Sequence, residues 1–193
     1  MKQHEYTLVL SGLNRVSRLT TVGKADNARE LIALLVSVLR YRHSRKGQLV
    51  PVSAELEAVG NFSALVRECF GNSLDLRVSA PEDGGGEVFI PHYAIMTFAE
   101  NSLLHAYDEE IAVWRLNVSV VAHDGSISVE VSDNGRGFHA EEYLNGKADS
   151  DSDYGSLGST LSRLESYYGD RYTISVDSSP DTGTAVSLSL LVF

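Results

Sequence analysis

Four separated segments of the sequence hold polar side chains and glycines whose types and spacing could do chemistry. In the first segment, Asn101 and His105 lie four residues apart. Residues at this spacing share one face of a helix, where an amide oxygen can meet Mg²⁺ and an imidazole can meet a phosphate. The four segments are Glu100-Asn101-Ser102-Leu103-Leu104-His105, Asp133-Asn134-Gly135-Arg136-Gly137, residues 155–158 with a glycine near each end, and Gly183-Thr184.

The hydrophobic pattern predicts the elements that must position these segments. Helices are expected over residues 53–66, 91–107 and 157–168, and strands over residues 74–78, 116–120, 127–131, 172–178 and 185–192. The dipeptide Asp124-Gly125 is typical of a tight turn and makes the second and third strands a hairpin. Helices packed on one face of a mixed or antiparallel sheet form an α+β fold, here a two-layer α/β sandwich.

The first fifty residues predict an antiparallel helical hairpin in front of this sandwich. Apolar residues recur at helical steps over residues 4–21 and 25–41, with a short turn between them. Two helices cannot bury so much apolar surface alone, so they must dock on another domain or pair with a second copy as a four-helix bundle. We expect a helical hairpin over residues 1–47, with a dimerisation or phosphoacceptor-like character, and a separate domain over residues 52–193.

Composition and charge exclude several classes of partner. The formal charge of −10 argues against nucleic acid and anionic lipid, which are bound by clustered Lys and Arg. Cys69 is the only cysteine, which excludes an intrachain disulfide and a cysteine-built zinc site. The longest apolar stretch is too short to cross a bilayer, which needs about 20 residues. We expect a cytoplasmic chain without membrane contact of its own, and leave open that it is the cytoplasmic portion of a membrane sensor.

In order and spacing, the four segments resemble the ATP site of the Bergerat fold, which gyrase-type ATPases, MutL and histidine kinases share. The nearest likeness is to sensor histidine kinases of the LytS and YesM type, whose catalytic part contains E-N-x-x-x-H, D-N-G-x-G, R-L-x-x-x-Y-G and G-T. The matching positions are Pro91, Glu100, Asn101, His105, residues 133–137, Arg163, Leu164, Tyr168, Gly169, Gly183 and Thr184. Leu39-Arg40-Tyr41 and residues 52–56 extend the likeness to nearly the whole chain.

This resemblance implies a site for ATP and Mg²⁺. Asn101 would hold Mg²⁺, and Asp133 would accept a hydrogen bond from the adenine amino group. Glu100 and His105 would be catalytic, with Glu100 polarising a water or ordering the hydration of the metal. Five glycines complete the implied nucleotide site, because the backbone can approach the ligand closely at a glycine. They are Gly135, Gly137, Gly155, Gly158 and Gly183, and the resemblance adds Leu157 and Thr184 beside them. The implied protein partners are a second copy, bound through the N-terminal helices, and a response-regulator receiver domain.

The chain departs from the pattern of that family at three places. Thr7 stands where the family has its phosphorylated histidine, and His4 lies three residues earlier. The glycines of the box before the last helix, Gly155 and Gly158, are shifted by a residue or more. The loop between residues 138 and 154 is acidic, which gives no electrostatic steering to an ATP anion. These departures predict weak ATP affinity or slow phosphoryl transfer.

The sequence therefore supports more than one hypothesis. The first is the ATP-binding core of a two-component sensor histidine kinase, which transfers the γ-phosphoryl group of ATP to a histidine. The second is a degenerate, non-autophosphorylating module that binds a nucleotide or a partner and transmits a signal, for which Thr7 is the best support. The third is an active domain that phosphorylates a histidine or serine of another protein.

Overall fold

The computed structural model describes residues 2–44, 47–71, 74–80, 88–105, 113–123, 125–140 and 157–191, without the side chains of residues 2–7, 70, 104, 105 and 157. The helices are α1 (Lys2–Thr21), α2 (Ala25–His43), α3 (Val52–Phe70), α4 (Ala94–His105) and α6 (Leu157–Tyr168). The strands are β1 (Leu49–Pro51), β2 (Leu74–Ser79), β3 (Phe89–Pro91), β4 (Trp114–His123), β5 (Ser126–Asp133), β6 (Tyr172–Ser179) and β7 (Gly183–Leu191).

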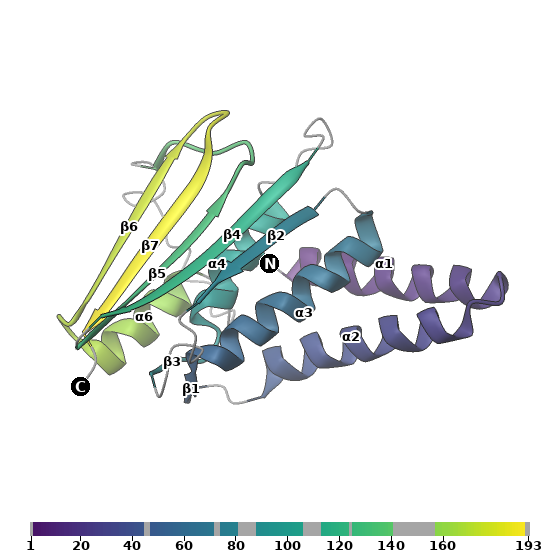
Figure 1. Ribbon diagram of the computed structural model, residues 1–193, viewed down its shortest axis with the longest axis horizontal. Coiled ribbons are helices and arrows are strands. Elements are labelled where there is room, and N and C mark those ends of the chain that lie inside the picture. Colours follow the sequence, from purple (N-terminus) through teal and green to yellow (C-terminus); the bar gives the residue numbers. More distant parts are fainter. Residues whose placement is uncertain are drawn as a thin grey trace.

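The central element is a five-stranded sheet in the order β2-β4-β5-β7-β6 (Figure 1). The strands β2 and β4 are parallel, and the other neighbours are antiparallel, so the sheet is mixed. In β5, buried Ile127, Val129 and Val131 alternate with side chains that are less buried, as expected for a strand with one face on the core. The α+β fold predicted from the sequence is confirmed.

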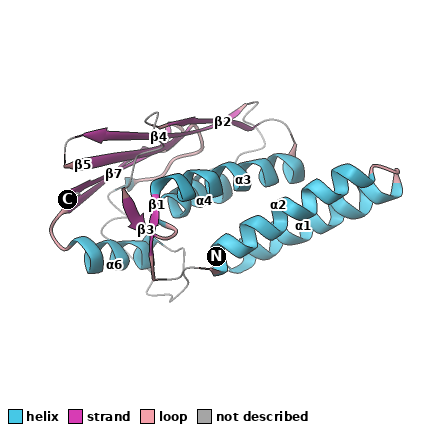
Figure 2. Cartoon of the chain, turned by 60° about the horizontal axis from the view of Figure 1, so that its bottom comes forward, coloured by secondary structure: helices cyan, strands magenta, loops and turns pink. Residues whose placement is uncertain are grey.

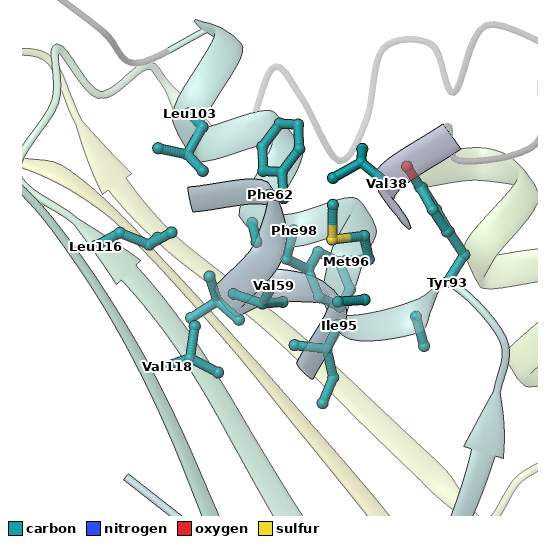
Figure 3. Close-up of a cluster of buried hydrophobic side chains, with 14 of the residues drawn as sticks. Val38, Val59, Phe62, Tyr93, Ile95, Met96, Phe98, Leu103, Leu116 and Val118 are labelled. Carbon is teal, nitrogen blue, oxygen red and sulfur yellow. The ribbon is translucent and has the colours of Figure 1, made fainter. Parts of the chain in front are cut away.

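The helices α3, α4 and α6 cover one face of this sheet and form the second layer (Figure 2). Figure 3 shows how the layers meet: Val59 of α3 and Ile95 of α4 lie over Leu116 and Val118 of β4. The helix α4 is apolar on nearly all sides and contacts β4, β5, α3 and α6. The helix α4 therefore packs between the sheet and the other two helices of the second layer, α3 and α6.

The helices α1 and α2 form the expected antiparallel hairpin, which packs on the side of α3 and α4 away from the sheet (Figure 2). Their contact is close, because a Cβ atom at Gly12 would lie 2.9 Å from the Leu35 side chain. Buried residues of the hairpin, including Leu31, belong to the same core cluster as those of the sandwich. The division into residues 1–47 and 52–193 stays a prediction.

The start of the fourth helix differs from the prediction. Pro91 was expected to begin it, whereas Pro91 ends β3 and pairs with Leu49 of β1, and the helix begins at Ala94. The strands β1 and β3 form a separate two-stranded antiparallel sheet that the hydrophobic pattern does not predict. Each has three residues, too few to show the alternation of a strand.

Candidate nucleotide site

Asp133 is the last residue of β5 and lies opposite Thr184, near the start of β7. Its Oδ1 atom accepts a hydrogen bond of 2.9 Å from the backbone N–H of Gly135. Its Oδ2 atom is buried and has no hydrogen-bond partner among the residues that the structure describes. Buried polar atoms are nearly always paired, so an exception asks for an explanation. This oxygen is suited to accept a hydrogen bond from a ligand.

The surroundings of Asp133 shift the pKa of its carboxyl group. Burial raises the pKa of this carboxyl above its usual 3.8. The Gly135 N–H, which bonds Oδ1, opposes that rise in pKa. The Ser102 hydroxyl of α4 and the Thr184 N–H also favour the ionised form, although neither makes a hydrogen bond to Oδ2. Because α4 packs on β5 and Ser102 of α4 acts on this pKa, Asp133 lies beside α4, the helix that carries Asn101.

Two predicted nucleotide-binding glycines hold the backbone around Asp133. A Cβ atom at Gly183 would lie 2.1 Å from the Asp133 carbonyl oxygen, and one at Gly137 would lie 2.0 Å from the Ser179 carbonyl oxygen. Both glycines have positive φ, +86° and +61°, which side chains rarely adopt. The close approach that requires glycine is therefore between backbone segments of the protein itself.

Neighbouring polar groups fix the segment after Asp133. The Ser178 hydroxyl accepts a hydrogen bond of 2.9 Å from the Phe138 N–H and lies 3.0 Å from the Thr184 hydroxyl. The Asn134 side chain accepts from the Arg115 N–H and donates to the Val113 carbonyl, which anchors it to the start of β4. The sequence did not predict a role for Ser178, because a serine within a strand forms no recognisable motif.

The predicted residues of α4 point in different directions. Successive residues of a helix are about 100° apart, so Asn101 is turned by that angle from both Glu100 and Ser102. Ser102 faces Asp133, which places Glu100 about 200° away, on the opposite side of the helix. Asn101 is half-buried between these two directions. Asp133 thus lies on the Ser102 side of α4, whereas Glu100 faces away from that side.

Glu100 faces the helical hairpin and forms a buried ion pair with Arg42 of α2. One guanidinium nitrogen of Arg42 donates to both carboxylate oxygens, at 3.0 and 3.1 Å. The side chains are 6% and 3% exposed. The Tyr93 hydroxyl donates to the same carboxylate, and the Arg42 guanidinium lies over the Tyr93 ring at 5.5 Å. Arg42 and Tyr93 were not among the predicted site residues.

A second buried carboxylate, Glu55 of α3, lies at the start of α4. It accepts hydrogen bonds from the Tyr93 N–H at 2.6 Å and the Met96 N–H at 3.0 Å, and from the Tyr41 hydroxyl. Tyr41 also contacts His92, whose Nε2 atom lies 2.8 Å from the Tyr41 carbonyl oxygen. The last turn of α2 is thereby joined to α4 at two points, its N-terminus and Glu100.

Comparison with known proteins finds relatives over most of the chain. The chain is 27% identical over 185 residues to the sensor protein LytS of Bacillus anthracis, covering 93% of the chain and 31% of LytS. It is 23% identical over 168 residues to the sensor histidine kinase BtsS of Escherichia coli, covering 86% and 28%. The chain is homologous to LytS-type sensor histidine kinases. It spans about a third of the length of these relatives. No protein-family model matches it.

Solved structures of other proteins share this fold. A histidine kinase domain from Erythrobacter litoralis superposes with a TM-score of 0.54 at 15% identity, covering 99% of the chain and 93% of that domain. Acinetobacter baumannii AdeS gives 0.55 at 11%, covering 97% and 96%. A bacterial phosphotransferase gives 0.59 at 11%, covering 96% and 90%. The hairpin is included in these matches, because they span nearly the whole chain.

The remaining LytS-type motif residues lie on α6 or outside the described residues. Gly158 is half-buried in the first turn of α6, which packs on α4 through a hydroxyl contact of 2.9 Å between Thr160 and Thr97. The Arg163 guanidinium, on the same helix, donates to the Thr160 hydroxyl at 2.8 Å. Predictions for Gly155 and for the side chains of His105, Leu157, Thr7 and His4 lie outside the described residues or side chains.

Two searches of the described part of the chain bear on metals and membranes. In residues 2–191, apart from the gaps given above, no three His, Cys, Asp or Glu side chains converge as a metal site. Within the same described residues, no helix combines the length and apolar character that a membrane span requires.

Proposed function

We propose that the chain is the ATP-binding core of a sensor histidine kinase and transfers the γ-phosphoryl group of ATP to a histidine. The buried Asp133 Oδ2 atom, unpaired among the described residues, carries this proposal. The adenine amino group is a hydrogen-bond donor and would complete this acceptor, whereas guanine presents a carbonyl oxygen at that position. The residues present therefore suit an adenine nucleotide.

The other roles follow from position on α4 and α6. Asn101 would offer its amide oxygen to Mg²⁺, which supplies charge neutralisation on the phosphates when bound. Gly158 lies in the first turn of α6, where free backbone N–H groups favour phosphate. Gly135, Gly137, Gly183 and Thr184 would shape the base pocket through the backbone. Gly155 and Leu157 stay proposed nucleotide-binding residues. Glu100 and His105 stay proposed catalytic residues.

The hairpin supports the proposal of a homodimer. Exposed apolar side chains remain on both helices, namely Leu10 and Leu13 on α1 and Ile32 and Val36 on α2. A second copy would cover them in a four-helix bundle. We further propose that the dimer works in the cytoplasm and passes its phosphoryl group to a response-regulator receiver domain. The naming of the relative BtsS as a sensor histidine kinase supports this proposal.

Calorimetric titration of the 193-residue chain with ATP and Mg²⁺ tests nucleotide binding. We expect saturable binding that Asp133→Asn weakens at least about tenfold, because the amide presents a donor to the adenine amino group. GTP should bind at least about tenfold more weakly than ATP for the same reason. The control is Asp177→Asn, which changes an exposed carboxylate of β6. Absence of saturable binding would contradict the proposal.

The second candidate function is that of a signalling module with the same fold that does not phosphorylate itself. Thr7 stands at the position that resembles the phosphoacceptor, so a degenerate module that binds nucleotide or a partner is the alternative. Incubation with γ-labelled ATP separates the two. An acid-labile phosphoprotein supports the kinase, and label only on an added protein's histidine or serine supports transfer to another protein. ATP binding without any labelled protein supports the degenerate module.

A further inference from the structure

Two buried threonines join α4, which carries Asn101, to α6, which carries Gly158. The Thr97 and Thr160 hydroxyl oxygens lie 2.9 Å apart, and both residues are 0% exposed. A buried threonine in a helix can satisfy its hydroxyl proton within its own helix, on the carbonyl four residues earlier. A hydroxyl contact between two helices goes further, because it fixes one helix against the other.

The direction of each hydrogen bond at this contact follows from the number of protons. The Thr97 hydroxyl has one proton and lies 2.7 Å from the Tyr93 carbonyl oxygen, which can only accept. Thr160 must therefore donate to Thr97. The Thr160 oxygen in turn accepts a hydrogen bond of 2.8 Å from the Arg163 guanidinium. The three bonds form a chain with one direction throughout, in which each bond polarises and strengthens the next.

This chain of hydrogen bonds lies about one turn from the proposed metal and phosphate positions. Thr97 and Asn101 are four residues apart and share a face of α4, so Asn101 lies on the side of α4 that meets α6. Gly158 precedes Thr160 by two residues, in the first turn of α6. The contact is therefore close to both groups that the proposed function assigns to the phosphates and their metal.

The helices α4 and α6 run in roughly opposite directions past the threonine contact. The Tyr168 hydroxyl, in the last turn of α6, donates to the Phe89 carbonyl of β3 at 2.7 Å. Since β3 leads directly into α4, the end of α6 lies toward the beginning of α4. The first turn of α6 consequently points toward the later part of α4, where Asn101 lies.

We propose that Thr97 and Thr160 are positioning residues for the phosphates of the nucleotide: their contact, supported by Arg163, sets the separation between Asn101 and the first turn of α6. This proposal rests on the proposed kinase function and adds the residues that fix the geometry of its phosphate side. The base side is separate, because Asp133 lies on the Ser102 side of α4.

Calorimetry of the full chain with two ligands, adenosine and ATP in the presence of Mg²⁺, tests the positioning role. Adenosine has no phosphate and reports on the Asp133 pocket alone. Thr97→Val keeps the shape of the side chain but cannot accept the Thr160 proton, so a buried donor loses its partner. We expect the Kd of ATP to rise roughly threefold to tenfold, and that of adenosine to stay within about twofold of wild type. Thr160→Val should give the same difference between the two ligands.

A loss of one buried hydrogen bond elsewhere is the matched control. Ser63 is buried and donates to the Val59 carbonyl of its own helix, α3, at 2.8 Å. Ser63→Ala should lower stability in urea unfolding but leave the ratio of the two dissociation constants unchanged. Thr97→Ser keeps the hydroxyl and should keep the wild-type ratio.

A double variant covers the case in which a single valine variant does not fold, as seen by circular dichroism. Thr97→Val combined with Thr160→Val leaves neither hydroxyl unpaired, and such paired replacements are nearly neutral for stability. The Tyr93 carbonyl keeps the backbone N–H of Thr97. The double variant should also bind ATP more weakly, with adenosine binding unchanged, because an apolar contact does not fix the direction of the two helices.

The possible outcomes separate the positioning role from the proposed function. A loss of affinity for ATP but not for adenosine in the valine variants supports the positioning role. Equal changes for the two ligands, no change for either, or the same difference in Ser63→Ala overturns the positioning role and leaves the proposed kinase function standing. Failure of the wild-type chain to bind either ligand overturns the proposed function, and the positioning role with it.

Discussion

The Glu55 carboxylate of α3 accepts a hydrogen bond of 3.0 Å from the backbone N–H of Met96 in α4. The first N–H groups of a helix have no partner within the helix, and here an acidic side chain from another helix supplies one. The negative charge also complements the positive end of the α4 dipole. Glu55 thus fixes the start of the helix that carries Asn101 and Glu100.

Replacing Glu55 by Gln should destabilise the fold by about 1–3 kcal/mol, because one carboxylate oxygen becomes an amide donor facing buried N–H groups. Urea unfolding followed by circular dichroism measures the loss. Glu57→Gln, at an exposed position of the same helix, is the matched control and should change stability by less than about 0.5 kcal/mol. Equal stability of the two variants would refute the capping role.

The same carboxylate predicts a pH dependence of stability. Burial raises the pKa of Glu55 above its usual 4.5, against hydrogen bonds from Tyr41, Met96 and Tyr93 that lower it. The folded state therefore binds this proton more tightly than the unfolded state. The resulting stability is fully present below pH 4.5 and is lost as the pH rises through the folded pKa. The unfolding free energy of wild type minus that of Glu55→Gln should fall with rising pH in this window; a flat or rising difference would contradict the assignment.

Gly183→Ala should destabilise the protein by at least about 3 kcal/mol for two reasons. The new methyl group would clash with the Asp133 carbonyl oxygen, and alanine is strained at the positive φ of this position. ATP binding should weaken at least about tenfold if Asp133 is displaced. Gly23→Ala is the control, because Gly23 also has positive φ, +76°, but has open space around it. It should cost only about 1–2 kcal/mol. Similar losses in both variants would show that the contact with Asp133 is unimportant.

Leu13→Arg should weaken the proposed dimer at least about tenfold, because it places an unpaired charge in an apolar interface. Leu13 is 52% exposed on α1. Sedimentation of wild type and variant over a concentration series measures the dissociation constant. Val22→Arg is the control, at a 67% exposed residue in the turn after α1, and should leave the dimer intact. A monomeric wild-type chain would rule out this interface.

The helices and strands around the candidate site were largely predictable, because their periodicity is long and regular. The strands β4 and β5 and the glycine turn between them agree with the alternating pattern, and β7 begins at Gly183, two residues before the expected start at residue 185. The short pair β1 and β3 was not predictable, since each strand exists only through its pairing with the other. The helix α4 consequently begins after Pro91.

The candidate site was predictable in part. Asp133 lies beside α4, the helix that carries Asn101, whereas the convergence of the four segments on one nucleotide stays a prediction. The partners of Glu100 were not predictable, because Arg42 in α2 reads in the sequence as one more basic residue at the end of a surface helix. Only the packing of the hairpin on α4 turns it into a buried ion pair.

The sequence by itself determined the α+β elements and the order of the motif residues, because periodicity and glycine placement are local properties of the chain. The tertiary structure alone decided which way each functional side chain faces: Asp133 beside α4 with one oxygen unpaired among the described residues, and Glu100 turned to Arg42. The physical reason is that burial and pairing of charge depend on contacts between distant segments, and such contacts exist only once the layers have packed.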